Sequence, residues 1–267
     1  MNKFKTVAAM AASLCAVVSL NGCFMPRAHS MGASLMSVAH QPRISGDSTN
    51  AEISLGVNAF GSVAGEGANV DNVKSGGGNV SFMYRMGGSV SPLFASAAVG
   101  AFGGKLEFAC TESRCSDSEI KYKAWLKTKA GEDEYSFWDV QERLLVGADF
   151  NPGKYAIVGL AGGMQLFQGG GDYDDMRADL DDGHFIKSLE GRVGVAPFTS
   201  LWLGSRIGRD GKWGSVVAEF DMLYKNSIED WTSAMMLNYF HTSGFFGGVV
   251  WNSQLGYELN VGKTFVF

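Results

Sequence analysis

The last eleven residues of the chain, 257–267, constrain the fold more than any other stretch. Odd-numbered positions in this stretch are apolar or aromatic except for Lys263, and most even-numbered positions are polar or small. The apolar set is Tyr257, Leu259, Val261, Phe265 and Phe267, and the polar set is Glu258, Asn260, Gly262 and Thr264. A period of two is typical of a β-strand with one apolar and one polar face. Chain ends usually fray, so this regular terminal strand predicts a sheet that depends on its last residues.

The same ending resembles the C-terminal insertion signal of bacterial outer-membrane β-barrels, a Gly followed by a hydrophobic-x-aromatic terminus. Gly262, Phe265 and Phe267 match that signal, whereas Val261 stands where the family usually has a polar residue. The resemblance implies a small barrel of the OmpA and OmpX type in the outer membrane of a Gram-negative cell. It also implies two kinds of partner, the barrel-assembly machinery during biogenesis and the surrounding lipid and lipopolysaccharide.

The N-terminal residues 1–22 predict an export signal. Lys3 and Lys5 precede an apolar run over 7–20, which is too short to span a membrane stably. Residues 20–23 resemble a bacterial lipobox, with Asn21 as its unusual member, and this implies cleavage before Cys23 and acylation of its thiol, with palmitate among the chains. Plain cleavage nearby is the alternative.

The rest of the chain divides into two parts. Residues 23–50 are polar and aperiodic and are predicted to form an acylated periplasmic tether. Residues 51–267 show no linker or long repeat and are predicted to be one outer-membrane domain. Cys110 and Cys115 lie in a polar segment, and an exported protein is expected to join them in a disulfide. Two free thiols are the alternative.

Composition favours strands and excludes several functions. Gly supplies 36 of 267 residues, and beyond the signal no apolar stretch reaches the ~20 residues that a spanning helix needs. Without Lys3 and Lys5, 20 basic residues face 27 acidic ones, a net charge of about −7 that argues against a nucleic-acid partner. No phosphate loop, Ser-His-acid order or Cys/His metal spacing is present, so we expect neither an enzyme nor a cofactor.

Period-two alternation predicts an all-β, antiparallel up-and-down transmembrane barrel of about ten strands, within a range of eight to twelve. The predicted strands fall near 51–59, 80–86, 93–101, 137–150, 154–167, 188–195, 201–207, 215–224, 231–239 and 254–267. Residues 197–200 are predicted to be a turn, and 118–135 could add a hairpin. A soluble β-sandwich lipoprotein, whose apolar faces pack together, is the alternative fold.

With an even number of strands, the first strand begins and the last strand ends on the same side of the membrane. That side is expected to be periplasmic, because the tether lies there. The long connections near 64–78, 105–136 and 168–184 are then extracellular. Aromatic residues are expected at both membrane interfaces. The predicted outer rim holds Trp138, Trp213 and Trp251, and the inner rim holds Trp202 and Trp231, although Trp202 has inward parity.

Inward positions are predicted to carry charges of both signs. They are Glu52, Arg85, Arg143, Glu190, Arg192, Arg206, Glu219, Asp221 and Glu258. Paired side chains that fill a narrow barrel are the favoured interpretation, and a charged permeation path is the alternative.

Residues 169–184 form a predicted acidic loop with six Asp. The weak metal-ligand candidates in it are Asp172, Asp174, Asp175, Asp179, Asp181 and Asp182. The spacing lacks the alternating ligands and closing Glu of an EF-hand, so a solvated acidic surface is favoured over a cation site. Asp182 and His184 are similar to the Asp-x-His of omptin proteases, but no second carboxylate pair faces them, and His241 is interpreted as interfacial.

The sequence therefore predicts a structural or surface-interaction protein that acts through extracellular loops. A narrow channel for small solutes and an omptin-like rim hydrolase are the rival functions. No loop sequence identifies an extracellular ligand.

Overall fold

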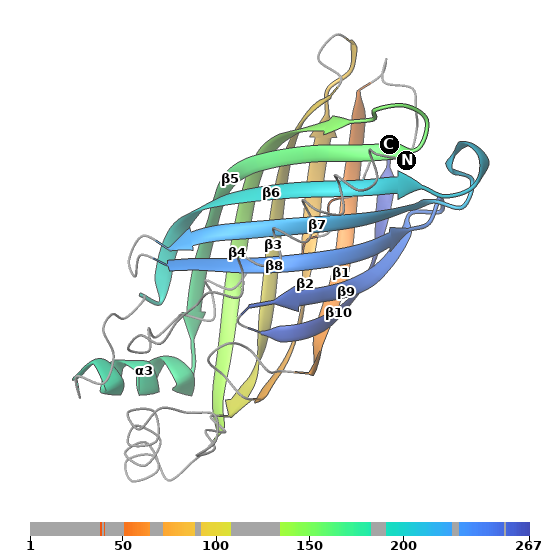
Figure 1. Cartoon of the computed structure of the whole chain (residues 1–267). Helices are drawn as coiled ribbons and strands as arrows, with labels where there is room; N and C mark the ends of the chain where they lie inside the picture. The colour runs from red at the N-terminus through yellow and green to blue at the C-terminus, as the bar shows by residue number, and fades with distance from the viewer. Residues whose placement is uncertain are drawn as a thin grey trace, which may run out of the picture.

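The computed structural model describes residues 38, 40, 51–64, 72–88, 92–107, 134–182, 191–225, 230–253 and 255–267. These residues form ten strands, the helix α3 and a short 3-10 helix, η3 (Figure 1). The strands are β1 (Glu52–Ala64), β2 (Asn72–Arg85), β3 (Leu93–Glu107), β4 (Glu134–Phe150), β5 (Ala156–Gly170), β6 (Val193–Arg206), β7 (Ser215–Lys225), β8 (Asp230–Phe240), β9 (Phe245–Asn252) and β10 (Gly256–Val266). The helices are α3 (Asp172–Asp182) and η3 (Arg209–Gly211). Among the described residues, no helix has the length and apolar character needed to cross a membrane.

The ten strands form one closed antiparallel barrel. Each strand pairs with its neighbours in the chain, and β1 closes the sheet on β10, with Leu55 opposite Phe265 and Ala59 opposite Val261. The amphipathic C-terminal strand is thus a closing strand of the barrel. The predicted fold class, an antiparallel up-and-down barrel, is confirmed.

Apolar side chains cover the outside of the barrel, while polar ones point inward. In β4, for example, Leu144 and Val146 are 56% and 66% exposed, whereas Gln141 and Arg143 are buried. Strands β6, β7 and β10 show a similar alternation of exposure, whereas the exposure pattern of β9 is irregular. Exposed apolar residues include Ile53, Leu55, Val57, Val80, Phe82, Val99, Leu160, Leu201, Leu203, Leu237, Val249, Leu259 and Val261. A sandwich would bury these residues between two sheets, so the sandwich alternative is wrong.

The two ends of the barrel differ in their connections. The end at which β1 begins and β10 ends, here called the short end, carries the connections 86–92, 151–155, 207–214 and 241–244. The opposite end, here called the loop end, carries the connections 65–71, 108–133, 171–192, 226–229 and 253–255. Helix α3 lies at the loop end, remote from the C-terminus (Figure 1). The predicted hairpin within 118–135 lies outside the described residues.

The predicted turn at 197–200 is wrong, because these residues continue β6. Pro197 pairs with Met164 of β5, and the pairing of β6 with β7 begins only at Phe198. Pro197 thus lies beyond one of the two ladders, where a missing N–H is tolerated. Two predicted strands, near 188–195 and 201–207, are therefore parts of one.

A strand that the sequence did not predict, β9, compensates for that error. Its sequence, FFGGVVWN, contains two adjacent glycines and lacks a clear alternation. The number ten was correct only because one strand was split and another was missed. As a consequence, the strands between residues 201 and 240 run in the direction opposite to the predicted one. Trp213 and His241 lie at the short end and not at the outer rim, and Trp231 lies at the loop end and not at the inner rim. Trp138 and Trp251 lie at the loop end as predicted.

The barrel lumen as candidate functional site

Most of the predicted inward charges do lie inside the barrel. Arg85, Arg143, Glu219, Asp221 and Glu258 are buried, and Glu52 is partly exposed at the short end. Two predictions were wrong. Arg206 lies at the rim, where it donates to Asn151 Oδ1 at 2.9 Å, and Arg192 is half exposed and pairs with Asp175. Glu190 lies outside the described residues.

A fully buried layer crosses the middle of the lumen. Arg143 and Asp221 are 1% and 0% exposed, and Arg143 Nη1 lies 3.6 Å from Asp221 Oδ2. The guanidinium also lies over the ring of Phe198, 4.1 Å from its centroid. Gln165, paired with Arg143 across the β4–β5 ladder, is equally buried. Charges without access to water need partners of this kind.

Asp149 organises the lumen near the short end. Its Oδ2 accepts from Arg85 Nε at 3.2 Å, and its Oδ1 accepts from Trp202 Nε1 at 3.0 Å. Arg85 also donates to Glu52 at 2.6 Å, so the charges form a network rather than one pair. Trp202, placed at a membrane interface by the sequence, is in fact 3% exposed in the interior. Gly159 makes room for it, because a Cβ at that position would lie 2.3 Å from the indole ring.

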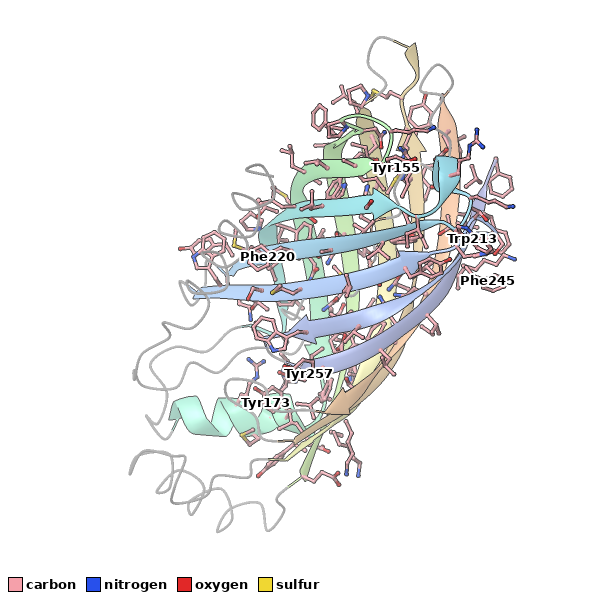
Figure 2. All side chains as sticks on the ribbon, turned by 45° about the vertical axis from the view of Figure 1, so that its right-hand side comes forward. Tyr155, Tyr173, Trp213, Phe220, Phe245 and Tyr257 are labelled. Carbon is pink, nitrogen blue, oxygen red and sulfur yellow. The ribbon has the colours of Figure 1, made fainter. Side chains whose placement is uncertain are left out.

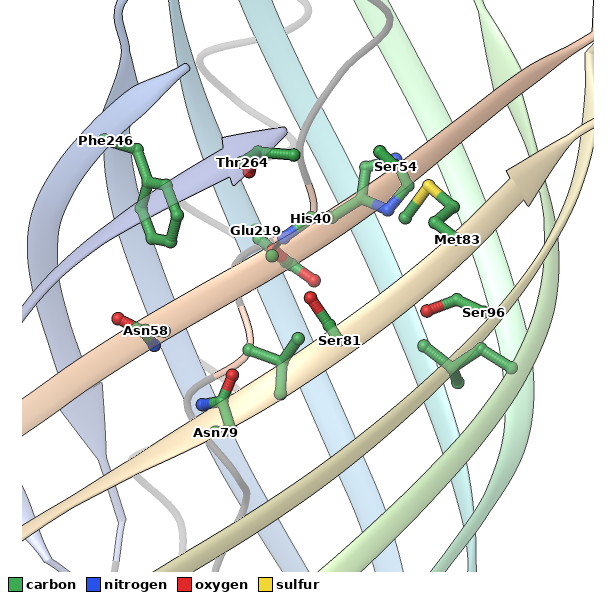
Figure 3. Close-up of a pocket in the computed structure, with 13 residues that line it drawn as sticks. His40, Ser54, Asn58, Asn79, Ser81, Met83, Ser96, Glu219, Phe246 and Thr264 are labelled. Atoms are coloured by element: carbon green, nitrogen blue, oxygen red, sulfur yellow. Dashed lines mark hydrogen bonds between the residues drawn. The ribbon is translucent and has the colours of Figure 1, made fainter. Parts of the chain in front are cut away.

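Asp149 was not among the predicted inward charges, and neither was His40. It belongs to the predicted periplasmic tether, yet it lies inside the barrel and is only 5% exposed. Its Nε2 lies 2.8 Å from Asp149 Oδ1, and its backbone N–H donates to Glu219 Oε2 at 3.0 Å. Figure 3 shows His40 in the interior of the barrel, next to Glu219. A single His in an aperiodic segment carries no spacing signal, so only the fold could reveal this position.

Aromatic and apolar side chains fill the lumen toward the loop end. Phe102 lies 6.1 Å from Phe60 and 5.9 Å from Phe137, measured between ring centroids. Leu106 and Tyr135 are buried nearby on β3 and β4. Rings from β1, β3 and β4 thus pack against one another in the lumen near the loop end.

The predicted acidic loop is in fact largely the helix α3. Its first-turn carboxylates already have partners: Asp172 accepts from the hydroxyl of Ser136 at 2.6 Å, and Asp174 pairs with Arg177. Tyr173 is buried on the same helix (Figure 2). Among the described residues, no group of three His, Cys, Asp or Glu is placed to hold a metal ion. The contact of Asp172 with Ser136 thus joins this helix to β4 at the loop end.

Four of the predicted site residues remain predictions. Cys23, Cys110, Cys115 and His184 lie outside the described residues. The proposed insertion signal lies at the end of β10, where the backbone N–H of Phe267 donates to the carbonyl of Ile53 at 2.9 Å.

Aromatic residues gather at the short end. Trp213 and Phe245 are 60% and 56% exposed and lie close together there (Figure 2). Lys263 Nζ lies 4.2 Å from the Phe245 ring centroid, a cation–π contact. Exposed rings with a basic residue among them are typical of a membrane–water interface.

A bilayer sets two conditions for any chain that crosses it. Hydrocarbon offers no partner to a backbone N–H or C=O, so the sheet must close, and the surface that meets lipid must be apolar. This barrel meets both conditions. The fold is that of an outer-membrane β-barrel.

No family model matches the chain. No curated protein matches it significantly in sequence. Solved structures with a similar shape include Ail of Yersinia pestis, crystallised with sucrose octasulfate, at 12% identity over 80% of this chain and 97% of that one, with a TM-score of 0.35. The translocator domain of NalP from Neisseria meningitidis shares 10% identity over 84% and 91%, with a TM-score of 0.35. Neisserial surface protein A shares 9% over 81% and 94%, with a TM-score of 0.27. These scores support no argument about function.

Proposed function

We propose that the protein is a closed outer-membrane scaffold, anchored by lipid at Cys23, that presents its loop-end segments to partners outside the cell. It is neither a channel nor an enzyme. The observation that carries this proposal is the filled lumen, because a solute path would require a continuous row of solvated side chains. Instead, Gln141, Arg143, Gln165 and Asp221 are all at most 1% exposed in the middle layer.

One cavity among the described residues of the lumen is small. A cavity of about 30 Å³ lies near the short end and is lined by His40, Ser54, Ser81, Glu219 and other residues (Figure 3). That volume is enough for about one or two water molecules. The narrow-channel function therefore has no support from the described part of the barrel.

Planar-bilayer recording tests the closed lumen directly. The purified protein should insert without producing discrete conductance steps, whereas a matched porin preparation in the same bilayer should produce them. Stepwise currents from this protein would contradict the proposal and favour the channel.

The loop end is the surface that we assign to binding. Its connections 108–133 and 171–192 are the longest in the chain. Helix α3 is fixed to the wall by the contact of Ser136 with Asp172 and gives that end a defined shape. Partners outside the cell are unknown, and lipopolysaccharide is the one that the location itself supplies. Replacing 108–133 by a short Gly-Ser turn should leave the barrel folded and abolish binding to cells or to lipopolysaccharide. Unchanged binding would contradict a loop-mediated role.

The anchor and the rival enzyme can be tested in the same cells. Metabolic labelling with palmitate should mark the wild-type protein in the outer-membrane fraction and not the Cys23→Ser variant. Labelling of both would place the acyl chain elsewhere. Proteolysis that disappears with His184→Ala would instead identify the rim hydrolase.

A further inference from the structure

The lumen near the short end contains a site whose occupant is part of the same chain. His40 lies between strands that are distant from it in sequence: Asp149 follows it by 109 positions and Glu219 by 179. Val38 lines the same cavity. The residues that contact His40, here called the seat, are Phe94 on β3, Asp149 on β4, Trp202 on β6 and Glu219 on β7. The seat therefore forms only when these four strands are assembled.

The seat matches an imidazole on three sides. The ring of His40 stacks on Trp202 at 3.9 Å between centroids with an angle of 25° between the planes, and the ring of Phe94 lies 4.9 Å away. The ring edge meets Asp149, a carboxylate held by Arg85 and Trp202. A carboxylate has no proton to donate, so the His40 Nε2 carries the proton in this contact. A planar ring with an N–H on its edge satisfies all three surfaces.

The seat also holds the main chain. The backbone N–H of His40 donates to Glu219 Oε2, while Glu219 Oε1 accepts from the hydroxyl of Ser200 at 3.0 Å. Glu219 is only 5% exposed. A contact to the backbone next to a contact to the side chain is how a site recognises a peptide segment rather than a lone ring.

We propose that the short-end half of the lumen is a binding site for an imidazole-bearing peptide segment, and that His40 is its resident ligand. The segment that carries Val38 and His40 then acts as an internal plug. It closes the short-end cavity to solutes and holds the predicted tether against the barrel. This inference rests on the proposed closed lumen and specifies how one half of it is closed.

Removing the plug should open a cavity that is accessible from the short end only, and not a pore through the barrel. The layer around Arg143 and Asp221 lies beyond this site, and the contacts of Arg143 with Asp221 and with the ring of Phe198 do not involve His40. Solutes should therefore enter from the short end and stop at that layer.

Thiol labelling measures access to the seat. Ser81 lines the cavity and points inward, so Ser81→Cys, in a Cys110→Ser, Cys115→Ser background, reports on a polar thiol reagent that reaches the lumen. The parent without Ser81→Cys supplies the background rate. His40→Gly should raise the labelling rate at least about tenfold, because it removes a hydrogen bond to a charged group together with the ring stack. His29→Gly, in the same segment, is the matched control and should leave the rate unchanged.

Free imidazole tests the chemistry of the site. Added to His40→Gly, it should refill the space between Trp202 and Asp149 and lower the labelling rate of Ser81→Cys, whereas sodium chloride at equal concentration should not. Labelling of His40→Gly at the parent rate would overturn the plug, and indifference to imidazole would overturn the assignment of the ligand.

A second measurement covers the possibility that His40→Gly does not fold. Val38→Cys combined with Ser81→Cys should form a disulfide in the otherwise unchanged barrel, since both positions line one cavity. Failure to cross-link would also overturn the plug. Conductance of the wild-type protein would instead contradict the proposed closed lumen. Conductance that arises only in His40→Gly would show that the plug alone closes the barrel, and would overturn the prediction that solutes stop at the layer around Arg143 and Asp221.

Discussion

Removal of the Arg143 side-chain charge should destabilise the barrel more than removal of any rim charge. The guanidinium is 1% exposed, faces Asp221 and lies over Phe198. Arg143→Met keeps most of the side-chain length but leaves Asp221 and Glu219, two buried carboxylates on the same face of β7, without their cation. Breaking a buried ion pair by removing one partner costs about 3–5 kcal/mol. We expect a loss of that size in the free energy of unfolding.

Equilibrium urea unfolding in detergent micelles, followed by tryptophan fluorescence, measures the loss. Arg206→Met is the matched control, because Arg206 lies at the rim and its hydrogen bond to Asn151 is worth about 1 kcal/mol. Addition of Asp221→Asn to Arg143→Met should recover part of the loss, with a coupling energy on the order of 0.5–3 kcal/mol.

The reasoning fails if Arg143→Met costs no more than Arg206→Met. Solvated ion pairs contribute only about 0–1 kcal/mol, so such a result would mean that water fills the middle of the lumen. The barrel would then be open and not packed, and the channel function would return.

Three further predictions test the wall and its assembly. Leu144→Arg, near the middle of the lipid-facing side of β4, should cost about 2–4 kcal/mol in lipid vesicles, whereas Val193→Arg at the loop end of β6 should cost at most about 1 kcal/mol; equal costs would contradict the assumed depth. Gly159→Ala should lower the free energy of unfolding by about 1–3 kcal/mol, because the added Cβ forces Trp202 from its place. Gly162→Ala on the same strand is the control: its Cβ would have only one atom within 4 Å, at 3.8 Å, and should leave the free energy of unfolding unchanged. Deletion of Phe267 should lower the fraction of heat-modifiable barrel in the outer membrane and Phe267→Tyr should not, unless the C-terminal signal is read elsewhere.

Alternation along the strands was enough to predict the barrel and its facing. Inward and outward parities were correct wherever a run such as 144–150 or 216–224 alternates cleanly, because a period of two has one interpretation when one face is apolar. The burial of Arg143 and Asp221 followed from the same pattern. The direction in which each strand crosses the barrel could not be predicted from this pattern, since it depends on every preceding turn being placed correctly.

The errors arose where local signals oppose the fold. Pro197 is common in turns, but here it lies in β6, outside the residues that pair with β7. The glycines of β9 weaken the alternation by which a strand is predicted, yet β9 is stabilised by pairing with both β8 and β10. Both cases are tertiary effects, because the propensity of a strand depends on its neighbours.

The position of His40 could not be predicted at all. Its partners lie on β3, β4, β6 and β7, and no spacing in the sequence brings them together. Asp149 has inward parity and was within reach of the alternation argument. Its role in binding His40 became visible only when the lumen was closed.

The most direct test of the account is the behaviour of the unacylated Cys23→Ser chain when detergent is removed. Size-exclusion chromatography with light scattering should find monodisperse protein in micelles and aggregates in plain buffer, because the exposed apolar belt then has no lipid or detergent to cover it. A monodisperse monomer in plain buffer would contradict a barrel whose outer surface meets hydrocarbon.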